Sequence, residues 1–281
     1  MNDSIQTDPA ALWVVATPIG NLGDMSPRAL DVLQQVKVVA AEDTRTSRRL
    51  FAERPAPEMI SLHEHNESAQ LDRLIERLSA GDSVALISDA GTPLVSDPGY
   101  RLVAAAHGAG IPVRTVPGPC AAIAALSVAG LPSDRFHFEG FLPARAGQRR
   151  TRLDNLADMD VTLIFYAPAR DLPEILGDMS AAFGEDRLAT LARELTKWHE
   201  TVRRARLAEL AGWVGSDPDQ QRGEAVVVVA GNAAPGGPVR PRALLRELAR
   251  ELPPSRAAKV LARLTGMSRR EAWALVEQND S

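Results

Sequence analysis

The chain has 281 residues, of which 45% are hydrophobic and 24% are charged, and its formal net charge is -4. This length and composition predict a globular protein with a sizeable core, built as one large or two medium domains plus a small appendage. The negative net charge excludes a protein that is coated all over with phosphate-binding cations.

Three further features narrow the class of protein. No apolar run approaches the roughly 20 residues that cross a bilayer. The first residues, Met1–Ser4, are polar and acidic, unlike a signal peptide, so we expect a cytoplasmic protein. The single cysteine, Cys120, excludes an internal disulfide and a structural thiolate zinc site, and we expect no metal.

Residues 1–11 are expected to be disordered, and strands and helices alternate from Leu12 onward. Ser26 as N-cap and Pro27 at the first helical position predict the start of the first helix. The predicted strands are 12–16, 38–40, 84–87 and 113–116, and the further predicted helices are 71–78, 100–107 and 121–129. Strands without polar alternation, separated by helices, indicate a parallel sheet that is covered on both faces.

A second α/β set follows residues 136–143. The polar and basic residues 144–152 predict a mobile loop at a domain junction. The predicted strands are 161–166, 187–192 and 225–230, with helices around Leu153, from Leu172 and from Leu207. We therefore expect α/β domains at 12–135 and 136–231.

The C-terminal tail differs from the rest in composition. Residues 232–241 are rich in Gly and Pro and predict a linker, and a small helical domain follows at 242–281. Its predicted helices are 242–251, 255–265 and 268–278, with Ser255 and Ser268 as N-caps and Gly266 in a turn. From residue 238 the tail has nine Lys and Arg against five Asp and Glu, so it carries +4 and the remainder about -8. A basic tail on an acidic body suggests contact with a polyanion, although solvated arginines explain the charge equally well.

Three loops after predicted strands are candidates for a ligand site, because ligands of open α/β sheets bind beyond the carboxyl ends of the strands. They are Thr17–Asp24, Ser88–Gly99 and Val116–Ala122. All three are dense in glycine, proline and small residues, which permits close backbone approach to a ligand. The first loop lacks both the phosphate-loop ending and the dinucleotide spacing, so its glycines are weak evidence for a nucleotide phosphate.

Five ordered blocks in these and neighbouring segments resemble the tetrapyrrole methylase superfamily, and most closely its ribosomal RNA branch. The blocks are Thr17–Asp24, Ala41–Arg45, Ser88–Gly99, Pro117–Ala122 and Phe138–Pro143. Members of this branch methylate the ribose 2′-oxygen of a cytidine in the decoding region of 16S ribosomal RNA. The resemblance implies two α/β domains with S-adenosyl-L-methionine in the cleft between them, a small helix-turn-helix-like C-terminal domain, and a homodimer that acts on 16S rRNA within the 30S subunit.

The same resemblance implies which residues meet the cofactor. Carried over by position, they are Pro18, Ile19, Gly20, Thr92, Val95, Cys120, Ala121, Tyr166, Ala192 and Ala230. Most of these are backbone or van der Waals contacts, and Cys120 is interpreted as a small packing residue. One segment departs from the family pattern, because Phe165–Arg170 lacks a Glu and a His that the family commonly has there, which excludes any catalytic task for those two groups.

Methyl transfer to a hydroxyl needs the reactants held in line and a group that accepts or steers the proton. The candidates in matching blocks are Asp43, Glu67, Lys197 and Glu200, with Glu42, His63 and Asn66 beside them. His63, Asn66 and Glu67 are equally suited to cap a helix that starts near Ser68, and Asp43–Arg48 to form a surface ion-pair cluster. The identity of the base is left open.

Basic side chains in two segments suit phosphate contacts around an RNA strand. They are Arg45, Arg48 and Arg49, then Arg145, Arg149 and Arg150, with Arg152 nearby. Two alternatives remain: a methylase of the same superfamily that acts on a tetrapyrrole or another small substrate, and a nucleic-acid-binding regulator whose tail reads DNA. The second leaves the three small-residue loops unexplained.

Overall fold

The computed structural model describes residues 10–51, 55–63, 66–232 and 241–279. The chain divides into two compact units. The first comprises the chain up to Val128 together with Ala192–Thr201, and the second comprises Ala129–Leu191 and the chain from Val202 onward. Within the described ranges, no helix is long and apolar enough to span a bilayer.

The first unit is built on a five-stranded parallel sheet. Its strands are β1 (Leu12–Val15), β2 (Val38–Ala41), β3 (Glu58–Ser61), β4 (Val84–Ile87) and β5 (Val113–Val116), in the order β3-β2-β4-β1-β5. Every residue of β2 and β4 is buried, which explains their uninterrupted apolar sequences. The predicted parallel sheet is confirmed. The edge strand β3 was not among the predicted strands, because it begins with an exposed Glu58 and has no apolar run.

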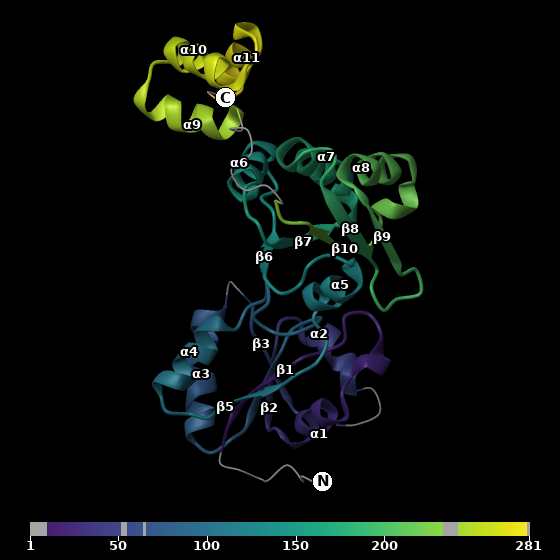
Figure 1. Ribbon diagram of the computed structural model, residues 1–281. Helices are drawn as coiled ribbons and strands as arrows, with labels where there is room; N and C mark the ends of the chain where they lie inside the picture. The colour runs from purple at the N-terminus through teal and green to yellow at the C-terminus, as the bar shows by residue number, and fades with distance from the viewer. Residues whose placement is uncertain (1–9, 52–54, 64–65, 233–240, 280–281) are drawn as a thin grey trace. The chain divides into compact units, whose positions relative to one another are not determined.

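Helices cover both faces of this sheet (Figure 1). The helices of this unit are η1 (Leu22–Asp24), α1 (Pro27–Gln35), α2 (Thr44–Ser47), η2 (Arg48–Phe51), α3 (Glu67–Ser79), α4 (Tyr100–Gly108) and α5 (Ala121–Ala129). On one face α1 packs Val32 and Leu33 against the strands, and on the other α3 and α4 pack Leu74 and Leu102. The predicted cap of α1 is confirmed, since the Ala29 amide donates to Ser26 Oγ over 3.1 Å.

The second unit holds a mixed sheet in the order β6-β7-β10-β8-β9. Its strands are β6 (Phe136–Phe141), β7 (Thr162–Pro168), β8 (Leu188–Arg193), β9 (Thr201–Arg206) and β10 (Glu224–Val229). β6 pairs with β7 in parallel, whereas β7 and β10 are antiparallel. The edge strand β9 was missed because three of its six residues are arginines and most of it is exposed.

The helices of this unit are α6 (Ala146–Leu156), η3 (Ala169–Asp171), α7 (Leu172–Phe183), α8 (Leu207–Ser216) and η4 (Pro218–Gln221). Leu153, Leu176 and Leu210 of the three α-helices join Phe165 and Val227 of the sheet in one core. The three α-helices lie together over one side of the sheet (Figure 1).

The tail forms three helices, α9 (Pro241–Glu251), α10 (Pro254–Thr265) and α11 (Arg269–Asn279), with a small core of their own. Ser268 caps α11 as predicted, because the Glu271 amide donates to Ser268 Oγ while the Glu271 carboxylate accepts from the Ser268 amide. Gly266 ends α10 at φ 75°, also as predicted. Ser255 is not a cap, since α10 already begins at Pro254. The predicted linker lies largely outside the described residues.

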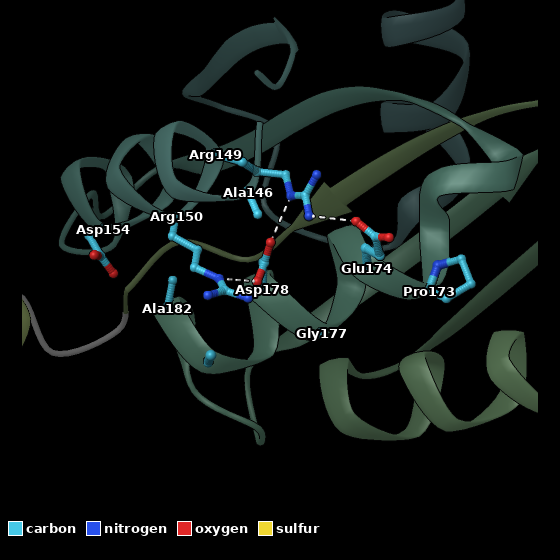
Figure 2. A pocket seen from close by; sticks show the side chains of 10 residues that line it. Ala146, Arg149, Arg150, Asp154, Pro173, Glu174, Gly177, Asp178 and Ala182 are labelled. Carbon is cyan, nitrogen blue, oxygen red and sulfur yellow. Dashed lines mark hydrogen bonds and ion pairs between the residues drawn. The ribbon is translucent and has the colours of Figure 1, made fainter. Parts of the chain in front are cut away.

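The expectation of a mobile loop at 144–152 was wrong, because α6 runs through most of it. Figure 2 shows the reason, an ion-pair cluster between α6 and α7. Arg149 is buried and donates from Nε to Asp178 Oδ2 over 2.7 Å and from Nη2 to Glu174 over 3.0 Å. Arg150 binds the other oxygen of Asp178 over 2.7 Å. Arg149 was predicted to contact RNA, and that prediction is corrected, because its guanidinium is occupied inside the protein.

The cluster generates a stability prediction. Asp178→Ala leaves Arg149 buried and without its main partner, so we expect a loss of about 3–5 kcal/mol in the free energy of unfolding. Urea denaturation followed by circular dichroism measures this loss. Glu174→Ala is the matched control, because the Glu174 side chain is 75% exposed and its removal should cost less than about 1 kcal/mol. Equal losses of unfolding free energy in both variants would show that Asp178 is not the main partner of Arg149 in the cluster.

Candidate functional site

The three loops predicted to form a site are joined to one another in the first unit. Their strands β4, β1 and β5 are neighbours in the sheet, so the loops leave the same edge side by side. Thr17 and Gly91 exchange backbone hydrogen bonds of 2.8 and 3.1 Å, and Thr17 Oγ1 donates to the Ser88 carbonyl. Thr92 Oγ1 donates to the Pro119 carbonyl over 2.9 Å. The second loop is therefore tied to both the first and the third.

Close packing explains the glycines at these contacts. A Cβ on Gly118 would lie 2.9 Å from Ala16 Cβ, and a Cβ on Gly91, whose φ is 83°, would lie 3.4 Å from Ile19 Cγ2. Leu94 and Ser96, in the same loop as Gly91, also have positive φ although they carry side chains. A positive φ is a strained backbone conformation for residues that carry a side chain, and such strained residues cluster at functional sites. The loop therefore has the character of a ligand-binding segment.

A turn from β8 to β9, residues Ala192–Thr201, belongs to the first unit, and we call it the returning turn. Lys197 lies over Gly20 of the first loop, because a Cβ on Gly20 would meet Lys197 Cγ at 2.5 Å and Cε at 2.9 Å. Lys197 Nζ pairs with Glu194 Oε1 over 2.8 Å. Glu200 Oε2 accepts from the Thr196 amide over 2.6 Å. The predicted candidates Lys197 and Glu200 thus belong to the same unit as the three loops, which chain order did not indicate.

Carboxylates gather after β2 and β4, which are adjacent in the sheet. Burial raises the pKa of Glu42 above its usual value, and the nearby charges of Asp89 and Asp97 raise it further. Burial and Asp89 likewise raise the pKa of Asp97. Asp89 and Asp97 were not among the residues predicted from the sequence. Both are acidic residues in the loop that directly follows a predicted strand, and this pattern could have indicated them.

Asp43 has the opposite character. Its carboxylate accepts from Nε and Nη2 of Arg45 over 3.1 and 2.8 Å, and from the Arg45 amide over 2.8 Å. These bonds lower the pKa of Asp43 to about 2. A carboxylate with so low a pKa is a weak proton acceptor near neutral pH. The ion-pair interpretation of this segment therefore holds for Asp43 and Arg45.

Glu67 has a structural contact. It is buried, and its Oε1 accepts from the Arg101 amide in the first turn of α4 over 3.0 Å. Asn66 precedes α3 but does not cap it, since its side chain bonds the His63 amide and the Ser61 carbonyl. Glu67 was expected either to act in catalysis or to cap the helix that starts near Ser68. In the structure it caps the neighbouring helix α4 instead.

The predicted cofactor contacts fall in both units. Pro18, Gly20, Thr92, Val95, Cys120 and Ala121 are half-buried or exposed on the three loops, whereas Ile19 and Ala192 are buried. Tyr166 on β7 packs edge-on against Phe138 and Phe141, with ring centroids 4.9 and 5.4 Å apart. Tyr166 pairs with Val226 of β10, and Ala230 comes four residues later, just beyond the end of that strand, so the two predicted contacts are about 13 Å apart in the strand direction. Tyr166 and Ala230 are therefore not neighbours.

The predicted RNA contacts differ in availability. Arg48 and Arg49 are exposed in η2, and Arg145 is exposed before α6. The Arg45 side chain is 90% exposed while it pairs with Asp43, and Arg150 is half-exposed while it pairs with Asp178. A surface ion pair costs little to break, so Arg45 can reach a polyanion, as can the exposed Arg48, Arg49 and Arg145. Arg150 differs, because its partner Asp178 is buried, and only the exposed half of its side chain is available.

Comparisons with known proteins agree with this architecture. Residues 11–211 match the family of Tetrapyrrole (Corrin/Porphyrin) Methylases, and residues 236–277 match the RsmI C-terminal HTH domain. A protein of Pseudomonas aeruginosa called ribosomal RNA small subunit methyltransferase I is 56% identical, over 91% of this chain and 93% of the relative. A protein of the same name from Xylella fastidiosa is 51% identical, over 94% and 98%. In fold, the chain resembles uroporphyrin-III C-methyltransferase from Thermus thermophilus complexed with S-adenosyl homocysteine, with TM-score 0.54, 21% identity, and 79% and 97% coverage.

The carboxylates at the ends of β2 and β4 generate a titration prediction. Asp89→Asn should lower the pKa of Glu42, because it removes a neighbouring negative charge. Arg45→Gln should raise the pKa of Asp43 from about 2, because the carboxylate loses its cation. Carboxyl carbon shifts in NMR spectra recorded against pH measure both. Asp72→Asn, on α3, serves as a control that should leave Glu42 unchanged, and an unchanged Glu42 in Asp89→Asn would contradict the coupling.

Proposed function

Because the chain belongs to the ribosomal RNA small subunit methyltransferase I branch of the tetrapyrrole methylase family, we propose that it methylates a ribose 2′-oxygen of 16S ribosomal RNA with S-adenosylmethionine as methyl donor. The target is a cytidine in the decoding region. The observation that carries the proposal is the identity of 51–56% to relatives of that name over more than nine-tenths of the chain. A tetrapyrrole substrate is less well supported, since the tail matches a domain named for the ribosomal RNA enzyme.

The loops of the first unit fit the methyl donor. Small residues stand half-buried along them, including Thr92, Cys120 and Ala121, so a ligand can approach the backbone closely. Thr196 Oγ1 is buried beside Gly20 and has no hydrogen-bond partner in the described part of the chain, so a polar group of a ligand would satisfy it. When bound, the donor supplies an electrophilic methyl group on a sulfonium. The further contacts proposed for it are Pro18, Ile19, Gly20, Val95, Tyr166, Ala192 and Ala230.

Among the four catalytic candidates, the geometry favours Lys197. Asp43 is held by Arg45, Glu67 caps α4, and Glu200 binds the Thr196 amide and so shapes the returning turn. Lys197 lies against Gly20 and pairs with Glu194. We assign to Lys197 the contact with the ribose 2′-hydroxyl, whose proton it steers during transfer. Glu42, whose pKa is raised by burial and by neighbouring carboxylates, is the second candidate for proton transfer.

The proposed assembly is a homodimer that acts in the cytoplasm on the 30S subunit. On α5, Ile123 and Val128 are 50% and 48% exposed, and a second copy of the chain would cover such apolar surface. Arg45, Arg48, Arg49, Arg145 and Arg150 are the proposed phosphate contacts on the body of the protein.

The tail adds a second RNA contact in this proposal. Arg256, Lys259 and Arg263 are exposed on α10 at spacings of three and four residues, which places them in one row on the helix surface. The opposite face of α10 packs Ala258 and Leu261 into the tail core. No ion pair involves these three cations in the ranges that the structure covers. The row is therefore free to meet RNA phosphates.

The function is tested by mapping 2′-O-methylation on 16S ribosomal RNA from a strain that lacks the gene. We expect one cytidine of the decoding region to lose its methyl group and to regain it when the gene is restored. An unchanged methylation map would contradict the proposed substrate.

A bulky residue in the third loop should exclude the methyl donor. Ala121→Trp is expected to weaken S-adenosylmethionine binding at least about 100-fold, because the indole fills the space beside the loop backbone. Isothermal titration calorimetry measures the affinity. Ala104→Trp is the matched control, since Ala104 is exposed on α4 and belongs to none of the three loops. Unchanged affinity in Ala121→Trp would show that the donor binds elsewhere.

The tail row should control salt-dependent binding to the ribosomal particle. Replacing Arg256, Lys259 and Arg263 by Gln should weaken binding to 30S subunits and reduce the slope of log K against log salt by about 2–3. Donor affinity should be unchanged. The control replaces Arg73, Arg135 and Arg222 by Gln, which changes the net charge by the same amount as the tail variant. These three arginines are exposed but ion-paired. A lower melting temperature with an unchanged salt slope would instead make the tail a stabilising cap.

A further inference from the structure

Trp198, in the returning turn, is 96% exposed. The chain has four tryptophans, and the other three each have a partner. Arg114 lies over Trp13, Arg203 lies over Trp213, and Trp273 Nε1 donates to Glu277. Within the described residues no such contact is found for Trp198. A large apolar ring so fully exposed has no role in the core of this unit and is typical of a binding surface.

The backbone that carries Trp198 is firmly held. The Lys197 amide donates to the Glu194 carbonyl over 3.0 Å, and the Glu200 amide donates to the Lys197 carbonyl over 3.1 Å. Arg193 Nη2 reaches across the turn to the His199 carbonyl over 3.2 Å. Glu194 and Thr196 have φ of 51° and 66°, a strained conformation that such bonds maintain. The indole therefore projects from a fixed base and not from a loose loop.

The position of Trp198 in the chain limits what it can meet. It directly follows Lys197, whose side chain lies against Gly20 in the first loop. A nucleotide whose ribose lies at Lys197 brings its own base, or the next one, within reach of an indole one residue away. Unpaired RNA bases are commonly recognised by stacking on aromatic side chains, whereas bases inside a duplex are not available for it.

We propose that Trp198 is a stacking platform for an unpaired base of the RNA substrate, at or beside the nucleotide that is methylated. This inference rests on the proposed function. It requires the target to be single-stranded or turned out of a helix when it binds. Trp198 is a positioning residue, because it holds the substrate and takes no part in the transfer of the methyl group or the proton.

The test compares full-length Trp198→Ala and Trp198→Phe with the wild-type protein. Loss of one stacking contact should raise KM for 30S subunits on the order of 10-fold, with kcat changed less than about 3-fold, and Phe should restore most of the binding. A short single-stranded oligocytidine should quench the tryptophan fluorescence of the wild-type protein and leave that of Trp198→Ala nearly unchanged. Tyr100→Ala, which removes an aromatic ring that is 74% exposed on α4, is the matched control and should leave KM unchanged.

The outcomes separate this inference from the proposed function. Equal KM and equal quenching in Trp198→Ala and wild type would overturn the stacking role. So would a Trp198→Ala protein that sediments as a monomer where the wild type is a dimer, because a second copy would then cover the indole. If oligocytidine binds through Trp198 but no ribosomal RNA is methylated, the stacking inference holds and the substrate assignment fails.

Discussion

The candidate site depends on the close backbone pairing between Thr17 and Gly91. It joins the loops after β1 and β4, and the bond from Thr92 to the Pro119 carbonyl adds the loop after β5. The pairing is possible because β1 lies between β4 and β5 in a parallel sheet, so the loops that follow these three strands leave the sheet at the same edge. Small residues are needed at the crossings, as the contact of Gly118 with Ala16 shows. The same small residues leave backbone accessible to a ligand.

Charge is arranged around these loops by the same topology. β2 lies beside β4, so Glu42 and Asp89 follow adjacent strands, and their mutual repulsion adds to the burial that raises the pKa of Glu42. Asp43 directly follows Glu42, and its hydrogen bonds with Arg45 lower its pKa to about 2. Neighbouring carboxylates thus differ in proton affinity because Glu42 is partly buried among like charges, whereas Asp43 is held by the cation of Arg45. Such separation is common where proton transfer is required.

Much of this was predictable from the sequence, and the exceptions share a physical cause. Buried parallel strands such as β4 are indicated by uninterrupted apolar runs, and caps such as Ser26 by local chemistry. The edge strands β3 and β9 lack that signal, because exposed strands need no apolar run. Arg149 was expected to be a surface cation, because nothing in the neighbouring sequence indicates a partner for it. The partner, Asp178, is brought to it only by the fold. The place of Lys197 against Gly20 joins residues that are far apart in the chain, and no local pattern encodes it.

The central claim is that the first loop and the returning turn act as one catalytic unit, and a double-mutant cycle tests it most directly. Gly20→Ala forces Lys197 aside, since the added Cβ would lie 2.5 Å from Lys197 Cγ, and Lys197→Met removes the amine. The quantity to measure is kcat/KM for methylation of 30S subunits. If the two residues act together, the double variant will be no slower than the slower single variant, within about 3-fold. Losses that multiply in the double variant would contradict the claim.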